Sequence, residues 1–539
     1  MRHRLDTRLL STAVALCAAA AACAEIPEGT IDIGTLLIRG TAGAADDAVV
    51  RLAAAGYEAS VDERLEAIGL SRLCVAPAPG SGIDVPSAKD ILAAIAGITP
   101  PAGFEEAGFN YEYGIGGGQT GSLWVTRAVP HQNLDFRNQY ATQEIGIVAG
   151  DSYPGGPPGN RLSASGRGVI VAVLDTGVVP VGDLARVALP YSFDAVSGEL
   201  PSTGSPTLDP GGDGIDSDND GAIDECVGHG SFVGSLIALV APEARQLHIR
   251  CIESDGRTST LLIARGVNAA IDAGAHVVNI SAVVPNEPNL LGSVVDAARD
   301  EGIAIIASAG NSPVNQSTYP ASYPSAGSVS VSGPNFGFSA AFATFNREVD
   351  FCAPGESRYI GPATAPVPVD GEVVIGIIGR MPLDPTQPLY STASGSSFSS
   401  AFASGLAALV RGAQPEWPST AVPLASIGAS VVSHIAMTAH GMEVPREQQP
   451  FVGSGVIDCA AATLFVSTDT VPTLPFDINP AGGTASDGSP RIDGADLAAL
   501  LSAWGPVLPG RISYADLDHN RVVNGADLAA LLSRWTTTP

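Results

Sequence analysis

A run of six apolar residues, Val169 to Leu174, restricts the fold of this chain more than any other feature. The run is rich in β-branched residues and has no polar alternation, which is typical of a strand buried on both faces of a parallel sheet. Similar strand patterns follow at 246–251, 276–280, 303–308 and 329–332, and helical patterns alternate with them at 231–240, 259–273 and 292–300. This alternation predicts an α/β fold, with a doubly wound, mostly parallel sheet flanked by helices.

Length and charge limit the classes of protein that this chain can belong to. The 539 residues predict two to four structural units. The net charge of −28, with Lys89 the only lysine, argues against nucleic acid as a partner, because phosphate recognition needs a basic surface. Carboxylate-rich chains suit an extracellular setting and Ca²⁺, which prefers oxygen ligands.

The first residues resemble an export signal. Several arginines precede an apolar run from Leu9 to Ala22 that is too short to span a bilayer, and an A-x-A pattern ends at Ala24. We therefore expect a signal peptide at 1–24 and a secreted protein, extracellular or associated with the cell surface. Lipid anchoring at Cys23 is the less favoured alternative. No later segment has the apolar length of a transmembrane helix.

Cysteine spacing gives little evidence of a metal or disulfide framework. Five of the seven cysteines lie beyond the signal, and none forms a CxxC pair. At most two disulfides could form, and burial as small apolar side chains is the preferred interpretation for most of these cysteines.

Three separate segments supply the groups that serine hydrolysis needs: a nucleophile, a base and an acid that orients the base. Asp175 follows the first buried strand, at the carboxyl end where α/β sheets place their sites. His229 lies between two glycines at the start of a predicted helix. Ser397 opens a long apolar helix, whose positive end favours developing negative charge.

The motifs around these residues resemble those of the subtilisin family. They read VAVLDTGV around Asp175, GHGSFVGS around His229 and SGSSFSSAFASG around Ser397, in the order Asp, His, Ser. The segment 307–311 reads ASAGN, and the resemblance implies that Asn311 donates to the oxyanion. The resemblance covers about 167–465 and implies a subtilisin-like serine endopeptidase acting on proteins or peptides. The alternative is a catalytically weak subtilisin fold that serves in binding or docking.

The resemblance also identifies residues that would line the substrate cleft. These are Ser281, Ala282, Val283, Ser308, Ala309 and Gly310. Val283 stands where the family normally has glycine, and a β-branched side chain there should narrow the pocket for the residue before the cleaved bond, called P1. We therefore expect a preference for small P1 residues.

The remaining sequence divides into flanking units. Residues 25–115 resemble an inhibitor-type propeptide, with a permanently attached small α+β domain as the alternative. Residues 116–166 read as a linker and maturation region rich in Gly and Pro, exposed enough to be cut. The peptidase domain is expected at 167–466, a second linker at 467–476, and a small module of repeats at 477–539.

Two acidic stretches have the alternating oxygen ligands of calcium loops. The first contains Asp216, Asp218, Asp220 and Asp224, with a solvated acidic loop as the alternative. The second contains Asp516, Asp518, Asn520, Asn524 and Asp527, within a repeat that resembles dockerin type I. That resemblance implies a helical calcium-loop module and a cohesin-like partner, and a purely structural tail is the alternative. Structural Ca²⁺ and no organic cofactor are therefore expected.

Overall fold

A computed structural model describes most of the chain between Ile31 and Ser533. The described residues are 31–83, 91, 94–95, 103–114, 136, 139–147, 162, 164–180, 183–197, 212, 214–216, 223–284, 286–340, 342–360, 373–375, 377–380, 390–442, 444–446, 448–464, 494–508, 511–517 and 522–533. The expected signal peptide, Cys23, the linker 467–476 and the proposed calcium ligands Asp218, Asp220, Asp518 and Asn520 lie outside these residues.

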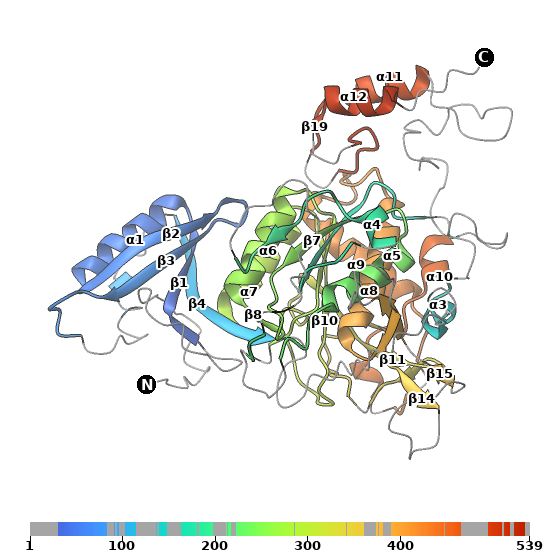
Figure 1. Cartoon of the computed structure of the whole chain (residues 1–539), viewed down its shortest axis with the longest axis horizontal. Coiled ribbons are helices and arrows are strands. Elements are labelled where there is room, and N and C mark those ends of the chain that lie inside the picture. Colours follow the sequence, from blue (N-terminus) through green and yellow to red (C-terminus); the bar gives the residue numbers. More distant parts are fainter. Residues whose placement is uncertain are drawn as a thin grey trace.

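The N-terminal unit is an antiparallel sheet covered on one side by a helix (Figure 1). Its strands are β1 (Ile31–Gly40), β2 (Tyr57–Leu65), β3 (Leu70–Pro77) and β4 (Phe104–Gly114), in the order β2-β3-β1-β4, and its helix is α1 (Ala42–Ala54). The sequence did not predict β2, in which the partly buried Ala59 and Val61 alternate with exposed polar residues. Residues 91, 94 and 95 are helical.

The central sheet contains the buried strands that the sequence predicted. Its order is β12-β11-β10-β9-β5-β7-β6, with β13 also paired to β11, and only β12 runs antiparallel to its neighbour. The bounds are β5 (Ile170–Asp175), β6 (Phe193–Asp194), β7 (Arg245–Arg250), β9 (Val277–Ile280), β10 (Ala304–Ser308), β11 (Ala326–Gly333), β12 (Gly337–Phe338) and β13 (Phe351–Pro354).

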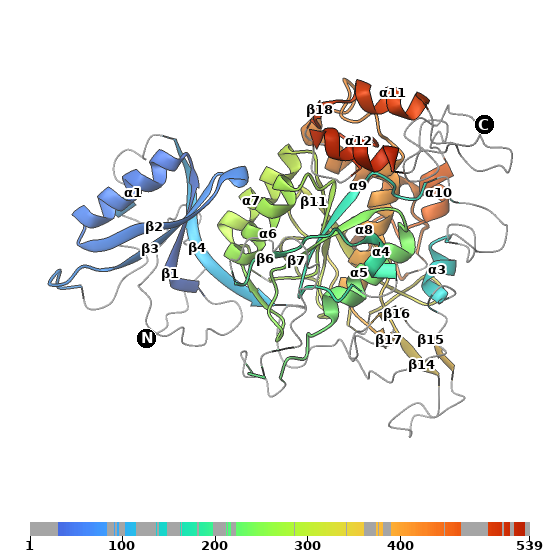
Figure 2. The same ribbon diagram turned by 45° about the horizontal axis from the view of Figure 1, so that its top comes forward.

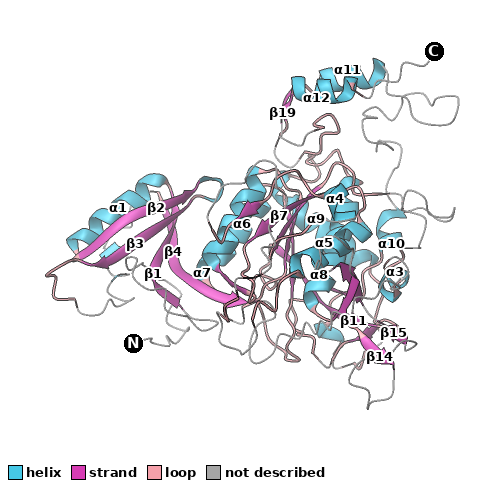
Figure 3. Ribbon diagram, in the orientation of Figure 1, coloured by secondary structure: helices cyan, strands magenta, loops and turns pink. Residues whose placement is uncertain are grey.

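Helices cover both faces of this sheet (Figure 3). They are α4 (Asp183–Val187), α5 (His229–Val240), α6 (Thr260–Asp272), α7 (Asn289–Asp300), α8 (Ser396–Gly412), α9 (Ile427–Thr438) and α10 (Cys459–Leu464). Val171 and Val173 of β5 pack with α5 and α8, whereas Ala172 and Leu174 pack with α6 and α7. Because β5 is buried on both faces, its apolar residues need no alternation. The predicted α/β fold is confirmed.

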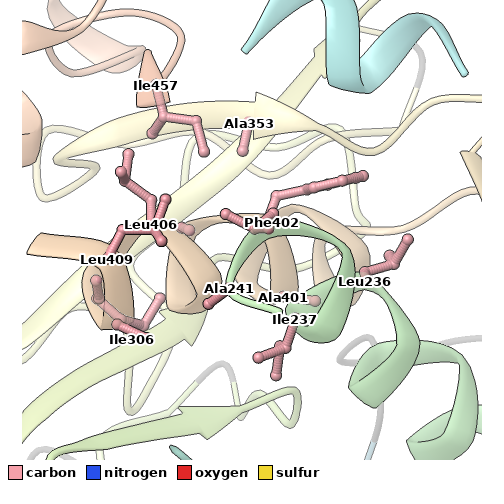
Figure 4. Close-up of a cluster of buried hydrophobic side chains, with 14 of the residues drawn as sticks. Leu236, Ile237, Ala241, Ile306, Ala353, Ala401, Phe402, Leu406, Leu409 and Ile457 are labelled. Atoms are coloured by element: carbon pink, nitrogen blue, oxygen red, sulfur yellow. The ribbon is translucent and has the colours of Figure 1, made fainter. Parts of the chain in front are cut away.

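The α8 helix lies at the centre of one core. All of its 17 residues are buried. Figure 4 shows Phe402, Leu406 and Leu409 of this helix among Ile237 of α5 and Ile306 of β10. A helix enclosed on all sides by a close-packed core has little freedom to move, so α8 gives the residues at its start a rigid support.

Part of the expected linker belongs to the peptidase core instead. Helix α3 (Tyr140–Glu144) and its flanks bury Ala141, Ile145 and Ile147 in the cluster that surrounds α8. The Tyr140 hydroxyl donates to the carbonyl of Glu356 at 2.7 Å, and the Cys459 amide donates to the carbonyl of Ile145 at 2.7 Å. The expectation of an exposed linker throughout 116–166 is therefore wrong for 139–147, and the peptidase core begins before residue 167.

The remaining elements are short. The strand pairs are β14 (Arg358–Ile360) with β15 (Val373–Ile375), β16 (Ile377–Arg380) with β17 (Tyr390–Ala393), and β18 (Gly505–Pro506) with β19 (Val522–Val523). Helices α11 (Gly494–Ser502) and α12 (Gly525–Leu532) form a C-terminal module around Leu500, Val523 and Leu531 (Figure 2). Among the described helices, none combines the length and apolar character needed to cross a membrane.

The five cysteines beyond the expected signal form no disulfide. Cys74 is partly buried, and Cys226, Cys251, Cys352 and Cys459 are buried with free thiols. Burial raises the pKa of the Cys352 thiol. The preference for buried, unpaired cysteines agrees with this arrangement.

Candidate active site

Asp175 and His229 are in direct contact inside the protein. The Nδ1 atom of His229 lies 2.7 Å from Oδ1 of Asp175, and both side chains are 1% exposed. Asp175 is the last residue of β5, and His229 is the first residue of α5. A carboxylate at this nitrogen fixes the orientation of the imidazole and leaves the other nitrogen, Nε2, to exchange protons with a nucleophile.

Small residues allow the helix that carries His229 to approach the strand that carries Asp175. A Cβ atom on Gly230 would lie 2.0 Å from the carbonyl oxygen of Gly177, so only glycine fits there. The Gly230 amide also donates to the Thr176 hydroxyl at 3.0 Å. The sequence predicted a close approach at the glycines beside His229, but it assigned no role to Thr176. The position of Thr176 directly after Asp175 could have indicated that it lies at the site.

Ser397 lies in the first turn of α8, as the sequence predicted. Its hydroxyl donates to the carbonyl of Ser281 at 3.4 Å. The next residue, Phe398, contacts the His229 ring, with centroids 5.6 Å apart. The start of α8 therefore lies beside the Asp175–His229 pair. The first amides of a helix lack acceptors within the helix and can bind an anion.

Asn311 is held against this same turn. Its Oδ1 atom accepts a hydrogen bond from the Ser396 amide at 2.7 Å, and its Nδ2 atom lies 3.6 Å from the position of a Cβ on Gly395. The Ser396 hydroxyl accepts from the Gly310 amide at 3.1 Å. Because the Ser396 amide occupies the carbonyl oxygen of the Asn311 amide group, its NH₂ group is directed elsewhere and can donate to an oxyanion. Ser396 was not predicted to have this positioning role.

The predicted cleft residues are adjacent to these groups. Ser281, Ala282 and Val283 follow β9, and Ser308, Ala309 and Gly310 follow or end β10, the neighbouring strand. All six are buried in the full chain. A Cβ on Gly310 would lie 3.8 Å from Cγ2 of Val283, so the valine side chain is within van der Waals reach of Gly310.

A second buried histidine lies on the strand next to the one that carries Asp175. His248 is on β7, which pairs with β5, and it is 2% exposed. Burial lowers the pKa of His248 to about 3, although the nearby charge of Asp175 acts in the opposite direction. His248 is therefore neutral near pH 7, so it leaves the charge of Asp175 available to His229.

The N-terminal unit extends to the edge of the peptidase domain. Strand β4 pairs antiparallel with β8 (Arg257–Ser259), with Glu112 opposite Ser259 and Gly114 opposite Arg257 (Figure 1). The side-chain oxygen of Asn110 also accepts a hydrogen bond from the Leu261 amide at 3.0 Å. A peptide segment that adds a strand to an exposed edge is a common mode of peptide binding.

Some of the expected calcium ligands lie within the described residues. Asp224 has a φ of 54°, and its Oδ2 accepts from the Gly214 amide at 2.8 Å. In the C-terminal module, Asp527 accepts from the amides of Leu517 and Asn524 at 2.6 and 2.8 Å. Within the part of the chain that the structure describes, no group of three or more acidic, His or Cys side chains is arranged to hold a metal.

Comparison with known proteins agrees with this geometry. A model of the subtilase family, Peptidase_S8, matches residues 166–452. Subtilisin BL from Lederbergia lenta is 28% identical over 319 residues, covering 57% of this chain and 95% of its own. Mycosin-3 from Mycobacterium tuberculosis is 28% identical over 405 residues, covering 62% of this chain and 81% of its own.

A solved structure extends the similarity of fold. Fervidolysin from Fervidobacterium pennivorans, described as a keratinolytic enzyme related to subtilisin, has a TM-score of 0.54 and 19% sequence identity. The match covers 86% of this chain and 65% of the fervidolysin chain. The chain belongs to the subtilase family and is a subtilisin-like serine peptidase.

Proposed function

We propose that this chain is a secreted endopeptidase that cleaves proteins or peptides through Ser397, His229 and Asp175. The buried contact between Asp175 and His229, beside the first turn of α8, carries the proposal. Because Asp175 fixes Nδ1 of His229, the Nε2 atom is the base that takes the proton from the Ser397 hydroxyl.

The reaction follows from these positions. The Ser397 oxygen attacks the scissile carbonyl carbon, and the resulting oxyanion accepts hydrogen bonds from the Asn311 side chain and the Ser397 amide. His229 then gives its proton to the leaving amine, which leaves an ester on Ser397. Water attacks this ester, with His229 again acting first as base and then as acid.

Labelling and mass spectrometry test the nucleophile. Wild-type protein should react with a fluorophosphonate at Ser397, hydrolyse casein and lose its N-terminal unit, whereas Ser397→Ala should do none of these. Ser404→Ala is a matched control, because Ser404 is a buried serine of the same helix and donates to Asn279 at 3.0 Å. A full-length, unlabelled and inert wild type would instead favour the alternative, a subtilisin fold used for binding.

The N-terminal unit serves in this proposal as an inhibitory propeptide. Its pairing with β8 supports this role, because a segment that adds a strand to the peptidase domain binds it in the way that a bound peptide does. Since 139–147 packs within the peptidase core, we place the processing site between Gly114 and Phe136. N-terminal sequencing of the mature enzyme tests this range, and a mature chain that starts beyond Phe136 would contradict it.

Calcium is proposed as a structural ligand in both acidic loops. In the C-terminal loop, Asp516 and Asp527 would bind it together with Asp518, Asn520 and Asn524, and in the first loop Asp216, Asp218, Asp220 and Asp224 would do so. Asp527 and Asp516 are 0% and 7% exposed, and both carboxylate oxygens of Asp527 accept amide hydrogen bonds that hold it in the loop. The alternating spacing of the oxygen ligands therefore carries the proposal. Bound calcium would crosslink each loop. A cohesin-like partner for the module remains a separate proposal, tested by binding to a cohesin domain.

A further inference from the structure

The segment between the two helices of the C-terminal module lies against the peptidase domain. Ile512 is 8% exposed and joins the hydrophobic cluster that surrounds α8. A Cβ on Gly168 would lie 2.6 Å from Cγ2 of Ile512 and 2.9 Å from Cε1 of Tyr514. The two domains therefore meet in close apolar contact, at a position where the peptidase domain has no side chain.

Hydrogen bonds fix the position of this segment on the peptidase domain. The Nδ1 atom of His276 accepts from the Ile170 amide at 3.1 Å, so in the neutral ring Nε2 carries the proton. That Nε2 lies 3.2 Å from the carbonyl oxygen of Arg511, to which it donates. The Arg511 guanidinium, in turn, donates to the carbonyl of Glu416 at 3.0 Å.

Tyr514 adds a contact at the end of α8. Its hydroxyl donates to the carbonyl of Gly412 at 3.4 Å, and the Arg167 guanidinium lies 5.8 Å from the centre of its ring. Burial raises the pKa of Tyr514 to about 12, which keeps the hydroxyl protonated. An arginine over an aromatic face is attractive, more so when water is excluded.

We propose that Arg511–Tyr514 is a built-in clamp that binds the C-terminal module non-covalently to its own peptidase domain. The clamp joins three separate parts of that domain: the turn before β5, the residue before β9 and the end of α8. The module is then a fixed part of the enzyme. It stays bound when the chain between the two domains is cut.

Cutting the chain between the peptidase domain and the C-terminal module tests the clamp directly. A specific protease site is inserted within 467–476 of the full-length Ser397→Ala protein, which cannot digest itself. After complete cutting, size-exclusion chromatography shows whether the C-terminal fragment elutes with the peptidase domain. Co-elution is expected, and separate elution of the two pieces overturns the clamp.

Matched variants test which residues are responsible. Ile512→Asp should release the fragment, because it places a charge in the apolar contact. Leu532→Asp adds the same charge at a side chain that is 50% exposed and should leave the fragment bound. Equal retention, or equal release, of the two variants would overturn the assignment.

Hydrogen exchange on the uncut chain provides a second measurement that does not depend on folding of an altered module. Arg167→Ala changes only the peptidase side of the contact. It should speed amide exchange in 511–517 by about tenfold, which corresponds to the loss of about 1.4 kcal/mol. Exchange in 511–517 of the parent protein at the rate of an unstructured peptide would show that this segment is not bound and would overturn the clamp.

Discussion

One ion pair should strengthen the binding of the N-terminal unit to the peptidase domain. The Arg265 guanidinium on α6 donates to both carboxylate oxygens of Glu63 on β2, with distances of 2.7 to 3.0 Å. Its third nitrogen donates to the carbonyl of Ala195 at 2.8 Å, which holds Arg265 in place before the N-terminal unit binds. The side chains of Arg265 and Glu63 are 12% and 25% exposed.

The expected loss of binding free energy follows from the geometry of this ion pair. Hydrogen bonds to charged groups contribute about 1.5–3 kcal/mol, and partial exposure of Glu63 places this pair near the lower part of that range. A loss of about 2 kcal/mol corresponds to roughly 30-fold weaker binding. We therefore expect Arg265→Ala and Glu63→Ala each to raise the dissociation constant by about this factor.

Biolayer interferometry measures the constant when residues 25–114 are supplied as a separate chain to a Ser397→Ala chain that starts at residue 116. Arg299→Ala is the matched control, because Arg299 pairs with Asp296 and Asp300 inside the peptidase domain. The double variant should bind no more weakly than either single variant, since both remove one interaction. A decrease in affinity of less than threefold would show that the Arg265–Glu63 pair contributes little to binding. Decreases that add in the double variant would show that the two side chains do not act as a pair.

Four further outcomes are expected. Asn311→Ala should lower kcat by about 10²–10³ with little change in KM, the size known for this donor in subtilisin, and an unchanged kcat would remove Asn311 from the mechanism. Val283→Gly should raise kcat/KM for Phe relative to Ala at P1 in a peptide library, and an unchanged ratio would show that Val283 does not border the pocket. Burial raises the pKa of Asp350 to about 6, so its ionisation costs stability as pH rises through that value. Asp350→Asn should therefore raise the melting temperature at pH 8 more than at pH 4, and equal shifts would contradict this. Calcium chelation should lower the melting temperature of the parent protein more than that of Asp527→Ala, and equal losses would exclude the second loop.

Local patterns predicted the central sheet and the groups of the site, because each depends on residues close together in sequence. The apolar run before Asp175 identified β5, and the small residues after Gly395 identified the start of α8. By contrast, α3 was not predicted, because it lies in a stretch whose average composition is that of a linker. Its few apolar residues, such as Ile145, become informative only when the cluster around α8 is known.

Contacts between distant segments could not be predicted from the sequence. The pairing of Gly114 with Arg257 joins two segments with no common pattern. The contact of Ile512 could not be predicted either. In the sequence Ile512 belongs to a connection between two helices, whereas in the structure its side chain packs against Gly168. Such contacts depend on the shape of two surfaces that exist only after each domain has folded.

The two flanking units contact different parts of the peptidase domain. The N-terminal unit lies against α6 and α7 and pairs with β8, which is not part of the central sheet. In parallel strands, the carboxyl ends share one edge, where β5 ends at Asp175 and β9 is followed by Ser281. The C-terminal module contacts the other edge, at Gly168 before β5 and at His276 before β9. Helix α8 separates the two edges, because its 17 residues extend about 25 Å from its start near Ser397 to Gly412. In the proposed function the N-terminal unit inhibits the enzyme from its position at β8, whereas the C-terminal module contacts the end of the sheet remote from Ser397. On that proposal, inhibition and attachment of the module can each be altered without the other.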